Sequence, residues 1–312
     1  MRSHDLIRDL KTILDRSDFA TSEFKSPGEV SFNLVSRRDD LLLLIKVIIA
    51  RDEISRNVSR SMVNLTRVLK GSPMIVVPST PSLPYQDGVL YISYGIPLLT
   101  FNTLFDHLIE EIPPLIYHGS HGFFVTLDGS LLRKRREMMQ VSLGALADAV
   151  GVSRKAIQMY EAGMGADMEV ALLMEKFLQT QLILPMDPFS YDDELQSIRD
   201  GIDTYHGMKK EVMEHLDSIG MEVVPTQRCP FDALARDKNE LLLASVGVGP
   251  RGIRNRAKDL KCISRITGGD SLVVVSDSVK ARKIDGTPIL RVSELKSTED
   301  PTGLIRMIRE RA

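Results

Sequence analysis

Two segments of the chain repeat one pattern of residues at a constant separation of 199 positions. FNLVSRRDDLLLLIKV occupies residues 32–47, and FDALARDKNELLLASV occupies residues 231–246. An ungapped alignment pairs identical residues: Phe32 with Phe231, Arg37 with Arg236, Leu42–Leu44 with Leu241–Leu243, and Val47 with Val246. Apolar strands always resemble one another to some extent, but a single offset held over many residues favours duplication over chance. We therefore expect one domain to occur twice.

The same order of elements accompanies each segment. Apolar residues at helical spacing follow it, at 54–69 and 253–266, and glycines end both helices. PMIVV at 73–77 and LVVVS at 272–276 predict buried strands, with Val76 paired to Val275 at the same offset. GIPLLTFNTL at 95–104 matches GTPILRVSEL at 286–295, and a helix precedes each copy, at about 4–16 and 206–219. Each copy is expected to be a mixed sheet covered by helices, with DGVLYISY at 87–94 as a hairpin-like insertion in the first copy only.

Helical periodicity replaces the β-rich pattern between residues 130 and 178. Ser142 is the expected N-cap of one helix, which Gly151 ends, and Ser153 is the N-cap of the next. In RKAIQMYEAG, Ile157 and Tyr160 are expected to face inward. The outward side chains are expected to be Arg154, Lys155 and Gln158. Asp167 is expected to start a further helix, with four buried residues: Val170, Leu173, Met174 and Phe177. An element around 180–184 is too short to assign.

The segment LLRKRREMMQVSLGALADAVGVSRKAIQMYEAG resembles the Cro/C1-type (Xre-like) helix-turn-helix family. The layout of the whole chain is similar to an archaeal family of transcriptional regulators in which such a module lies between two α/β segments. The resemblance implies that Arg154, Lys155 and Gln158 approach base edges in the major groove. It also implies that Ser153 and Arg136 bind phosphates, and Arg133 and Ser142 complete the expected DNA-binding set. Many members have glutamine where this chain has Leu143, which puts the phosphate contact at that position in doubt.

Local charge supports this interpretation on one face of the module only. Residues 133–155 carry six cations and two anions, whereas residues 161–175 carry four anions. The chain as a whole has a net charge of −2, which gives no global sign of nucleic-acid binding. A second basic stretch, RGIRNRAKDLKCISR at 251–265, has six cations against Asp259. It is either a contact to flanking DNA or the solvated face of a helix.

The two α/β copies resemble restriction-endonuclease-like folds, whose active members hold a divalent metal with two acids and use a lysine to assist the attacking water. The first copy has Lys46, but it has Asn33 and Leu44 where the acids would stand. The second copy has Asp232 but continues with Leu243-Ala244-Ser245. Each copy keeps a different single part of the pattern, so we expect no enzyme. His118 and His121 are spaced as a metal pair but lack a third ligand nearby, so a solvated loop is expected.

The expected fold is α/β plus all-α: two duplicated α/β domains flanking a Cro/C1-type helix-turn-helix bundle. The expected domains are the N-terminal α/β domain at 1–112, a linker or hairpin at 113–128, the helix-turn-helix at 129–184, a linker at 185–204, and the C-terminal α/β domain at 205–312. Two cysteines without CxxC spacing argue against disulfides or structural zinc, and no cofactor or metal motif is present. No apolar run approaches the length of a membrane span, so we expect a cytoplasmic protein.

The expected function is a sequence-specific, DNA-binding transcriptional regulator whose partner is double-stranded DNA. We expect a homodimer, because a single recognition helix reads too few bases for useful specificity. Two alternatives remain open: a structure-specific DNA nuclease, and a DNA-bound scaffold built on restriction-endonuclease-like domains.

Overall fold

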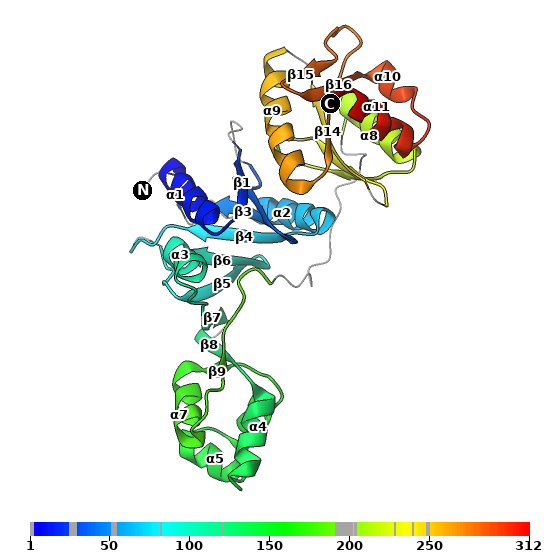
Figure 1. Ribbon diagram of the computed structural model, residues 1–312. Coiled ribbons are helices and arrows are strands. Elements are labelled where there is room, and N and C mark those ends of the chain that lie inside the picture. Colours follow the sequence, from blue (N-terminus) through cyan, green and yellow to red (C-terminus); the bar gives the residue numbers. More distant parts are fainter. Residues whose placement is uncertain are drawn as a thin grey trace. The chain divides into compact units, whose positions relative to one another are not determined.

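The computed structural model (Figure 1) divides the chain into two compact units. The first holds the described residues of 75–191 together with 49–50, and the second holds those of 2–48, 52–74 and 192–312. The structure describes residues 3–24, 30–50, 55–81, 83–119, 122–190, 202, 205–227, 229–238, 240–247 and 250–312.

The second unit contains the start of the first α/β copy. Its elements are α1 (Ser3–Arg16), β1 (Ala20–Glu23), β2 (Leu34–Arg38), β3 (Leu41–Val47) and α2 (Arg56–Leu69). β1, β2 and β3 pair as an antiparallel meander. The apolar face of α1 packs against this sheet. Strand β3 is buried along almost its whole length, because its run of leucines and isoleucine has helices or strands on every side.

The second unit also contains the whole second copy. Its elements are α8 (Met208–Ser218), β11 (Glu222–Pro225), β12 (Ala233–Arg236), β13 (Leu241–Gly247), α9 (Pro250–Thr267), β14 (Asp270–Val275), β15 (Lys283–Ile284), β16 (Thr287–Arg291), α10 (Val292–Lys296) and α11 (Pro301–Arg311). The strands form one mixed sheet in the order β11-β12-β13-β14-β16-β15. α8, α10 and α11 pack against it around a single apolar core.

Strand registers agree between the two copies. Val35 faces Leu44 across β2 and β3, and Leu234 faces Leu243 across β12 and β13, which is the same pair displaced by 199 residues. After the helices the displacement changes by one: β4 (Ser72–Val77) corresponds to β14 at 198 residues. Val76 therefore corresponds to Val274 and not, as the single offset predicted, to Val275. Between equivalent positions of these two strands the second copy therefore has one residue fewer than the first.

A glycine precedes β4 and β14 in the two copies, for one steric reason. A Cβ on Gly71 would lie 2.8 Å from the carbonyl oxygen of Leu42, and a Cβ on Gly269 would lie 2.8 Å from that of Leu241. Leu42 and Leu241 are equivalent in the repeat. The backbone therefore passes the neighbouring strand too closely for any side chain at this point, in both copies.

The first unit contains the remaining sheet and the helical module. Its elements after β4 are β5 (Val89–Ser93), β6 (Ile96–Thr100), α3 (Phe101–Ile109), β7 (Ile116–Gly119), β8 (Gly122–Leu127), α4 (Gly129–Met138), α5 (Leu143–Val150), α6 (Arg154–Glu161), β9 (Ala166–Asp167), α7 (Met168–Leu178) and β10 (Ile183–Leu184). β4 pairs parallel with β6, β6 antiparallel with β5, and β5 parallel with β7. β8 pairs with β7 and, on the helical side, with β9 and β10.

The segment expected as a linker or hairpin at 113–128 is thus a hairpin whose two strands continue a sheet. β7 is bonded to β5 of the α/β region, and β8 is bonded to β9 and β10 of the helical module. Figure 1 shows β7 and β8 between β5 and the helices α4, α5 and α7. Backbone groups of this segment are therefore paired both with the α/β region and with the helical module. Most of the expected linker at 185–204 lies outside the described residues.

Several elements differ from the sequence-based expectations. β1 and β11, of four residues each, were not expected: β1 carries no apolar run, and the apolar run of β11 is only Val223 and Val224. β5 is not an insertion peculiar to the first copy: β5 pairs antiparallel with β6 as β15 does with β16. The short element at 180–184 contains the strand β10.

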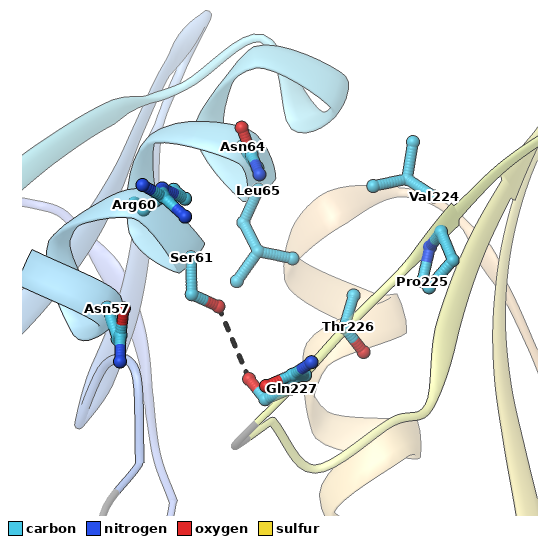
Figure 2. A pocket seen from close by; sticks show the side chains of 9 residues that line it. All are labelled: Asn57, Arg60, Ser61, Asn64, Leu65, Val224, Pro225, Thr226 and Gln227. Atoms are coloured by element: carbon cyan, nitrogen blue, oxygen red, sulfur yellow. Dashed lines mark hydrogen bonds between the residues drawn. The ribbon is translucent and has the colours of Figure 1, made fainter. Parts of the chain in front are cut away.

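Within the second unit, α2 faces β11 and the residues that follow it (Figure 2). Ser61 Oγ donates a hydrogen bond to the carbonyl oxygen of Gln227 at 3.2 Å, and Arg236 donates to the carbonyl oxygen of Val68 at 2.5 Å. A small polar pocket lies at this contact, lined on the α2 side by Asn57, Arg60, Ser61, Asn64 and Leu65, and on the other side by Val224–Gln227. The segments from the two copies are therefore held together by polar contacts as well as by packing.

Candidate nucleic-acid interface

Helices α4 to α7 form a bundle with its own apolar core. Its buried residues include Leu132, Leu146, Ala147, Val150, Ile157, Tyr160, Ala171, Met174 and Leu178. α5 and α6 are joined by a tight turn, in which Gly151 has the left-handed conformation (φ 74°, ψ 29°) and the amide of Val152 donates to the carbonyl of Ala147 at 3.0 Å. Ala147 is buried where a larger side chain would separate the two helices. This is the helix-turn-helix arrangement that the sequence predicted.

Serines cap both helices of the motif, as expected. Ser142 Oγ accepts the amide of Ala145, and Ser153 Oγ accepts the amide of Ala156, each at 3.0 Å. Both hydroxyls are exposed, and each keeps a proton that can be donated. The structure therefore assigns both serines a capping role that leaves room for a phosphate contact.

The outward face of α6 carries three polar side chains. Arg154, Lys155 and Gln158 are exposed, while Ile157 and Tyr160 anchor the opposite face in the core. At about 100° per residue the three side chains fall within roughly a third of the helix circumference. A Cβ on Gly144 would lie 3.6 Å from Cδ of Arg154, so the arginine stem runs beside the start of α5. The three side chains together offer guanidinium, ammonium and amide groups, which are the groups that read base edges and phosphates.

Arg136, expected at a phosphate, is paired with a carboxylate inside the module. It is only 9% exposed, and its Nε and Nη2 donate to Oε1 and Oε2 of Glu161 at 2.6 and 3.2 Å. Its Nη1 donates to the carbonyl of Val141 at 3.0 Å. The hydrogen bond to Glu161 raises the pKa of Arg136. The side chain thus fastens α4 to the last residue of α6, and the sequence could not indicate this because its partner lies 25 positions away.

The other cations of the module have mixed roles. Arg133 is exposed and pairs with Glu137 at 3.0 Å, one turn away, which leaves it available to solvent. Lys134 is exposed, and Arg135 donates to the carbonyl of Leu178 at the end of α7. Leu143 is half-buried against the core, so the position where relatives of this motif often have glutamine is apolar here. The positive surface of the module therefore rests mainly on Arg154, Lys155, Lys134 and Arg133.

Two glycines lie where the hairpin and α4 approach α6 and the segment after it, and neither leaves room for a Cβ. A Cβ on Gly165, in the segment after α6, would overlap the hydroxyl of Tyr117 from β7. A Cβ on Gly129, at the start of α4, would lie 2.5 Å from the carbonyl oxygen of Tyr160. Both contacts lie near the C-terminal end of α6. Neither was predicted, because glycine at these positions gave no signal beyond that of a loop.

Helix α7 begins after the N-cap Asp167 as expected but buries a different set of residues. Met174 is buried, and Val170 is half-buried. Leu173 and Phe177 were expected in the core but are 40% and 38% exposed. Ala171 and Leu178 are buried instead. They lie with Met174 on the face of α7 that packs against β8 and α5.

The nuclease-like position of the first copy lacks carboxylates. Asn33 Oδ1 accepts the amide of Val47 at 2.8 Å, and Leu44 is fully buried. Lys46 is 8% exposed, and its Nζ donates to the carbonyl of Val30 at 2.7 Å. The lysine is therefore bonded inside the fold, and the two positions that would hold a metal, Asn33 and Leu44, supply no carboxylate.

The equivalent position of the second copy has a carboxylate whose charge is already compensated. Asp232 Oδ2 accepts the amide of Val246 at 2.7 Å, as Asn33 does from Val47 199 positions earlier. Arg256 Nη1 binds the same oxygen at 2.7 Å, and Lys209 Nζ lies 2.6 Å from Oδ1. Asp232 is 6% exposed. Two side-chain cations thus stand where a metal ion would meet this carboxylate.

No group of three or more His, Cys, Asp or Glu side chains that could hold a metal occurs among the residues that the structure describes. His118 is exposed in β7, and its ring stacks on Tyr91 with centroids 5.4 Å apart. His121 lies outside the described residues. In the described part of the chain, no helix is both long and apolar enough to cross a membrane.

Comparisons with known proteins agree with this architecture. Residues 132–183 match the model of a helix-turn-helix family, and residues 3–114 match that of the PD-(D/E)XK superfamily domain. Relatives named "Putative HTH-type transcriptional regulatory protein" occur in Methanocorpusculum labreanum (33% identical, 99% of both chains), Methanocella arvoryzae (32%, 96% of both) and Methanocaldococcus jannaschii (33%, 91% of this chain and 90% of the relative). No solved structure matches the chain.

The match to the superfamily domain agrees with the resemblance to restriction-endonuclease-like folds, and the match at 132–183 agrees with the Cro/C1-type motif. Identity of 33% over 99% of both chains extends across the first copy, the helical module and the second copy together. The chain therefore belongs to this archaeal family of proteins named as helix-turn-helix transcriptional regulators.

Proposed function

We propose that the protein regulates transcription by binding double-stranded DNA sequence-specifically through α6. The observation that carries the proposal is the exposed face of Arg154, Lys155 and Gln158 on a helix held at both ends. Ser153 caps its start, and the Arg136–Glu161 pair fastens its end. A rigidly held helix loses little conformational entropy on docking, so its contacts contribute more fully to discrimination between sequences. The names of the relatives support the same function.

In-vitro selection of duplexes from a random pool tests this proposal. The full chain should enrich a defined sequence. Arg154→Ala combined with Gln158→Ala should weaken binding to the selected duplex by about 1–3 kcal/mol for each base-reading side chain removed, and binding to random duplex far less. Lys176→Ala, an exposed cation on α7, is the matched control and should leave the preference intact. Equal weakening on both duplexes would contradict base reading by α6.

We propose that the protein works as a homodimer. One helix of this kind reads few base pairs, and two copies related by a two-fold axis double the site. Leu172, Leu173 and Phe177 on α7 are exposed apolar side chains, a surface of the kind that a second copy could cover. Light scattering of the full chain should give a dimer mass, and Leu173→Glu with Phe177→Glu should shift it toward monomer. Gln181→Glu, an exposed position just after α7, should not.

We propose that neither α/β copy is a nuclease, so the protein is not an enzyme. Asn33 and Leu44 supply no carboxylate in the first copy, and Lys209 and Arg256 already bind Asp232 in the second. A divalent ion would have to displace two cations from one carboxylate. Incubation with branched and linear DNA in Mg²⁺ or Mn²⁺ should give no cleavage. Cleavage that Lys46→Ala abolishes would establish the nuclease alternative.

We propose a cytoplasmic location, without a membrane or cofactor partner, because the proposed ligand is chromosomal DNA. The two α/β copies then act as the framework of the regulator and as its surface for further contacts. Fractionation of cells should recover the protein with the soluble, DNA-containing fraction. Recovery with membranes after high-salt washing would contradict this location.

A further inference from the structure

The outer face of α9 carries a continuous row of cations. Arg254, Lys258, Lys261 and Arg265 are spaced i, i+4, i+7 and i+11, which places them within about 60° of one another around the helix. The opposite face, with Ala257, Leu260, Ile263 and Ile266, is buried. The row is about 16 Å long at 1.5 Å per residue. We call these four residues the α9 basic row.

The basic row is not neutralised within the described part of the chain. No side-chain carboxylate there forms an ion pair with any of the four cations, and Lys261 Nζ donates to a backbone carbonyl, that of Asp285, at 3.2 Å. Four other cations of this copy do form ion pairs: Lys209 and Arg256 with Asp232, Arg309 with Glu240 and Asp270, and Arg311 with Glu294. Residues 250–286 contain nine cations and four carboxylates, in a chain whose net charge is −2.

Three cations converge at one end of the row. Lys261 and Arg265 of α9 and Lys283 of β15 line the same depression, together with the hydroxyl-bearing Ser264 and Ser271. Among the described residues Asp270 is the one acidic side chain that lines it, and Arg309 binds that carboxylate at 2.8 Å; the last residue, Ala312, lines it too. A Cβ on Gly286 would overlap the ammonium group of Lys261, so the glycine leaves room for this cation. The arrangement leaves three cationic side chains at a depression that is open to solvent.

We propose that the α9 basic row and Lys283 form a second DNA contact that binds the phosphate backbone without reading bases. This inference rests on the proposed function, since it takes DNA as the ligand. The length of the row favours a polyanion over a single small anion, because duplex DNA presents one charge per about 1.7 Å of its axis. Three lysines among the five side chains favour phosphates over bases, since a lysine is a point charge with freely rotating donors.

The salt dependence of DNA binding by the full chain tests the proposal. Fluorescence anisotropy would be measured from 50 to 200 mM NaCl on a random duplex and on the duplex selected through α6. The test variant is Lys258→Gln/Lys261→Gln/Arg265→Gln. The control variant, Arg8→Gln/Arg16→Gln/Arg306→Gln, removes the same charge from exposed positions of α1 and α11. Circular dichroism confirms that each variant folds, and Lys258→Arg/Lys261→Arg checks that charge alone matters.

The slope of log K against log salt should become shallower by about 0.9 for each phosphate that the variant no longer neutralises, so by up to about 2.7 in the test variant. The change should be equal on both duplexes, and the control and the Lys→Arg variant should keep the wild-type slope. Equal slopes for the test and control variants would overturn the inference. Failure of the proposed function differs: the wild type would then not prefer the selected duplex, whatever its salt slope.

Discussion

The guanidinium of Arg136 and the carboxylate of Glu161 form a two-point ion pair, with Nε–Oε1 and Nη2–Oε2 distances of 2.6 and 3.2 Å. Arg136 lies in the last turn of α4, and Glu161 is the last residue of α6. Both side chains are about 10% exposed. The pair therefore connects the first helix of the module to the end of the recognition helix in a place that water barely reaches.

Removal of one partner of this pair should destabilise the module. Arg136→Ala leaves the Glu161 carboxylate buried and unpaired, so the free energy of unfolding should fall by about 3 kcal/mol. Arg133→Ala, which removes an exposed pair with Glu137 in the same helix, should cost under about 0.5 kcal/mol. Urea unfolding followed by circular dichroism measures the difference, and hydrogen exchange of the α6 amides locates it. Similar costs for the two variants would contradict the structural role of Arg136.

Ser153 allows stability and DNA binding to be separated. Ser153→Ala removes the cap of α6 and should cost about 1 kcal/mol of stability. Ser153→Asp keeps a cap acceptor and adds a charge that the helix N-terminus favours, so stability should be retained. The same charge should repel DNA and weaken binding by roughly tenfold. Thermal unfolding measures the stability of each variant, and fluorescence anisotropy on the same preparation measures its DNA affinity. An unchanged DNA affinity in Ser153→Asp would place this end of α6 away from phosphates.

Gly165 should tolerate a methyl group only when Tyr117 is shortened. Gly165→Ala sets its Cβ against the Tyr117 hydroxyl and should lower stability by about 1–3 kcal/mol through overpacking. Tyr117→Phe removes the clashing oxygen, so the double variant should recover much of that stability. Gly144→Ala is the control, because its Cβ would make only ordinary contact with Arg154, and it should be neutral or slightly stabilising. An additive double-mutant cycle would show that the two residues do not interact.

Acid should weaken the second copy through Glu294. The hydrogen bond from Arg311 lowers the pKa of Glu294 to about 2 from an ordinary value of 4.5. A lowered pKa in the folded state stabilises the fold above the unfolded pKa, and this stabilisation is lost as pH falls from about 4.5 to about 2. Its upper bound is about 3 kcal/mol. Glu294→Gln should flatten the decline of unfolding free energy in this window. Parallel pH profiles of wild type and variant would contradict the assignment.

Much of the site follows from local sequence. Ser142, Gly151 and Ser153 were predicted as caps and turn, and the structure has them in those roles, because a cap is decided within three or four residues along the chain. Ile157 and Tyr160 face inward and Arg154, Lys155 and Gln158 outward, because helical periodicity alone separates the two faces. The duplication could also be predicted from the sequence, because strands that are buried in the same way need apolar residues at the same positions.

Long-range partners account for what local sequence did not indicate. Arg136 was assigned to phosphate on its charge and position, but Glu161, 25 residues away, binds it. Leu173 and Phe177 were assigned to the core on apolarity, although the packing of β8 and α5 turns other residues of α7 inward. A linker or hairpin was expected at 113–128; the structure has a hairpin at 116–127, and local sequence did not indicate that it also pairs with β5, β9 and β10.

The sequence by itself determined the repeated α/β architecture, the boundaries of the recognition helix and its three outward side chains, since these depend on spacing over one or two turns. Only the tertiary structure decided which charges are neutralised and which remain available. Arg136, Lys209 and Arg256 are compensated by carboxylates, while the α9 basic row is not compensated within the described residues. A charged side chain is neutralised only when an opposite charge lies within a few ångströms. The packing of segments far apart in the chain decides whether such a partner is that close.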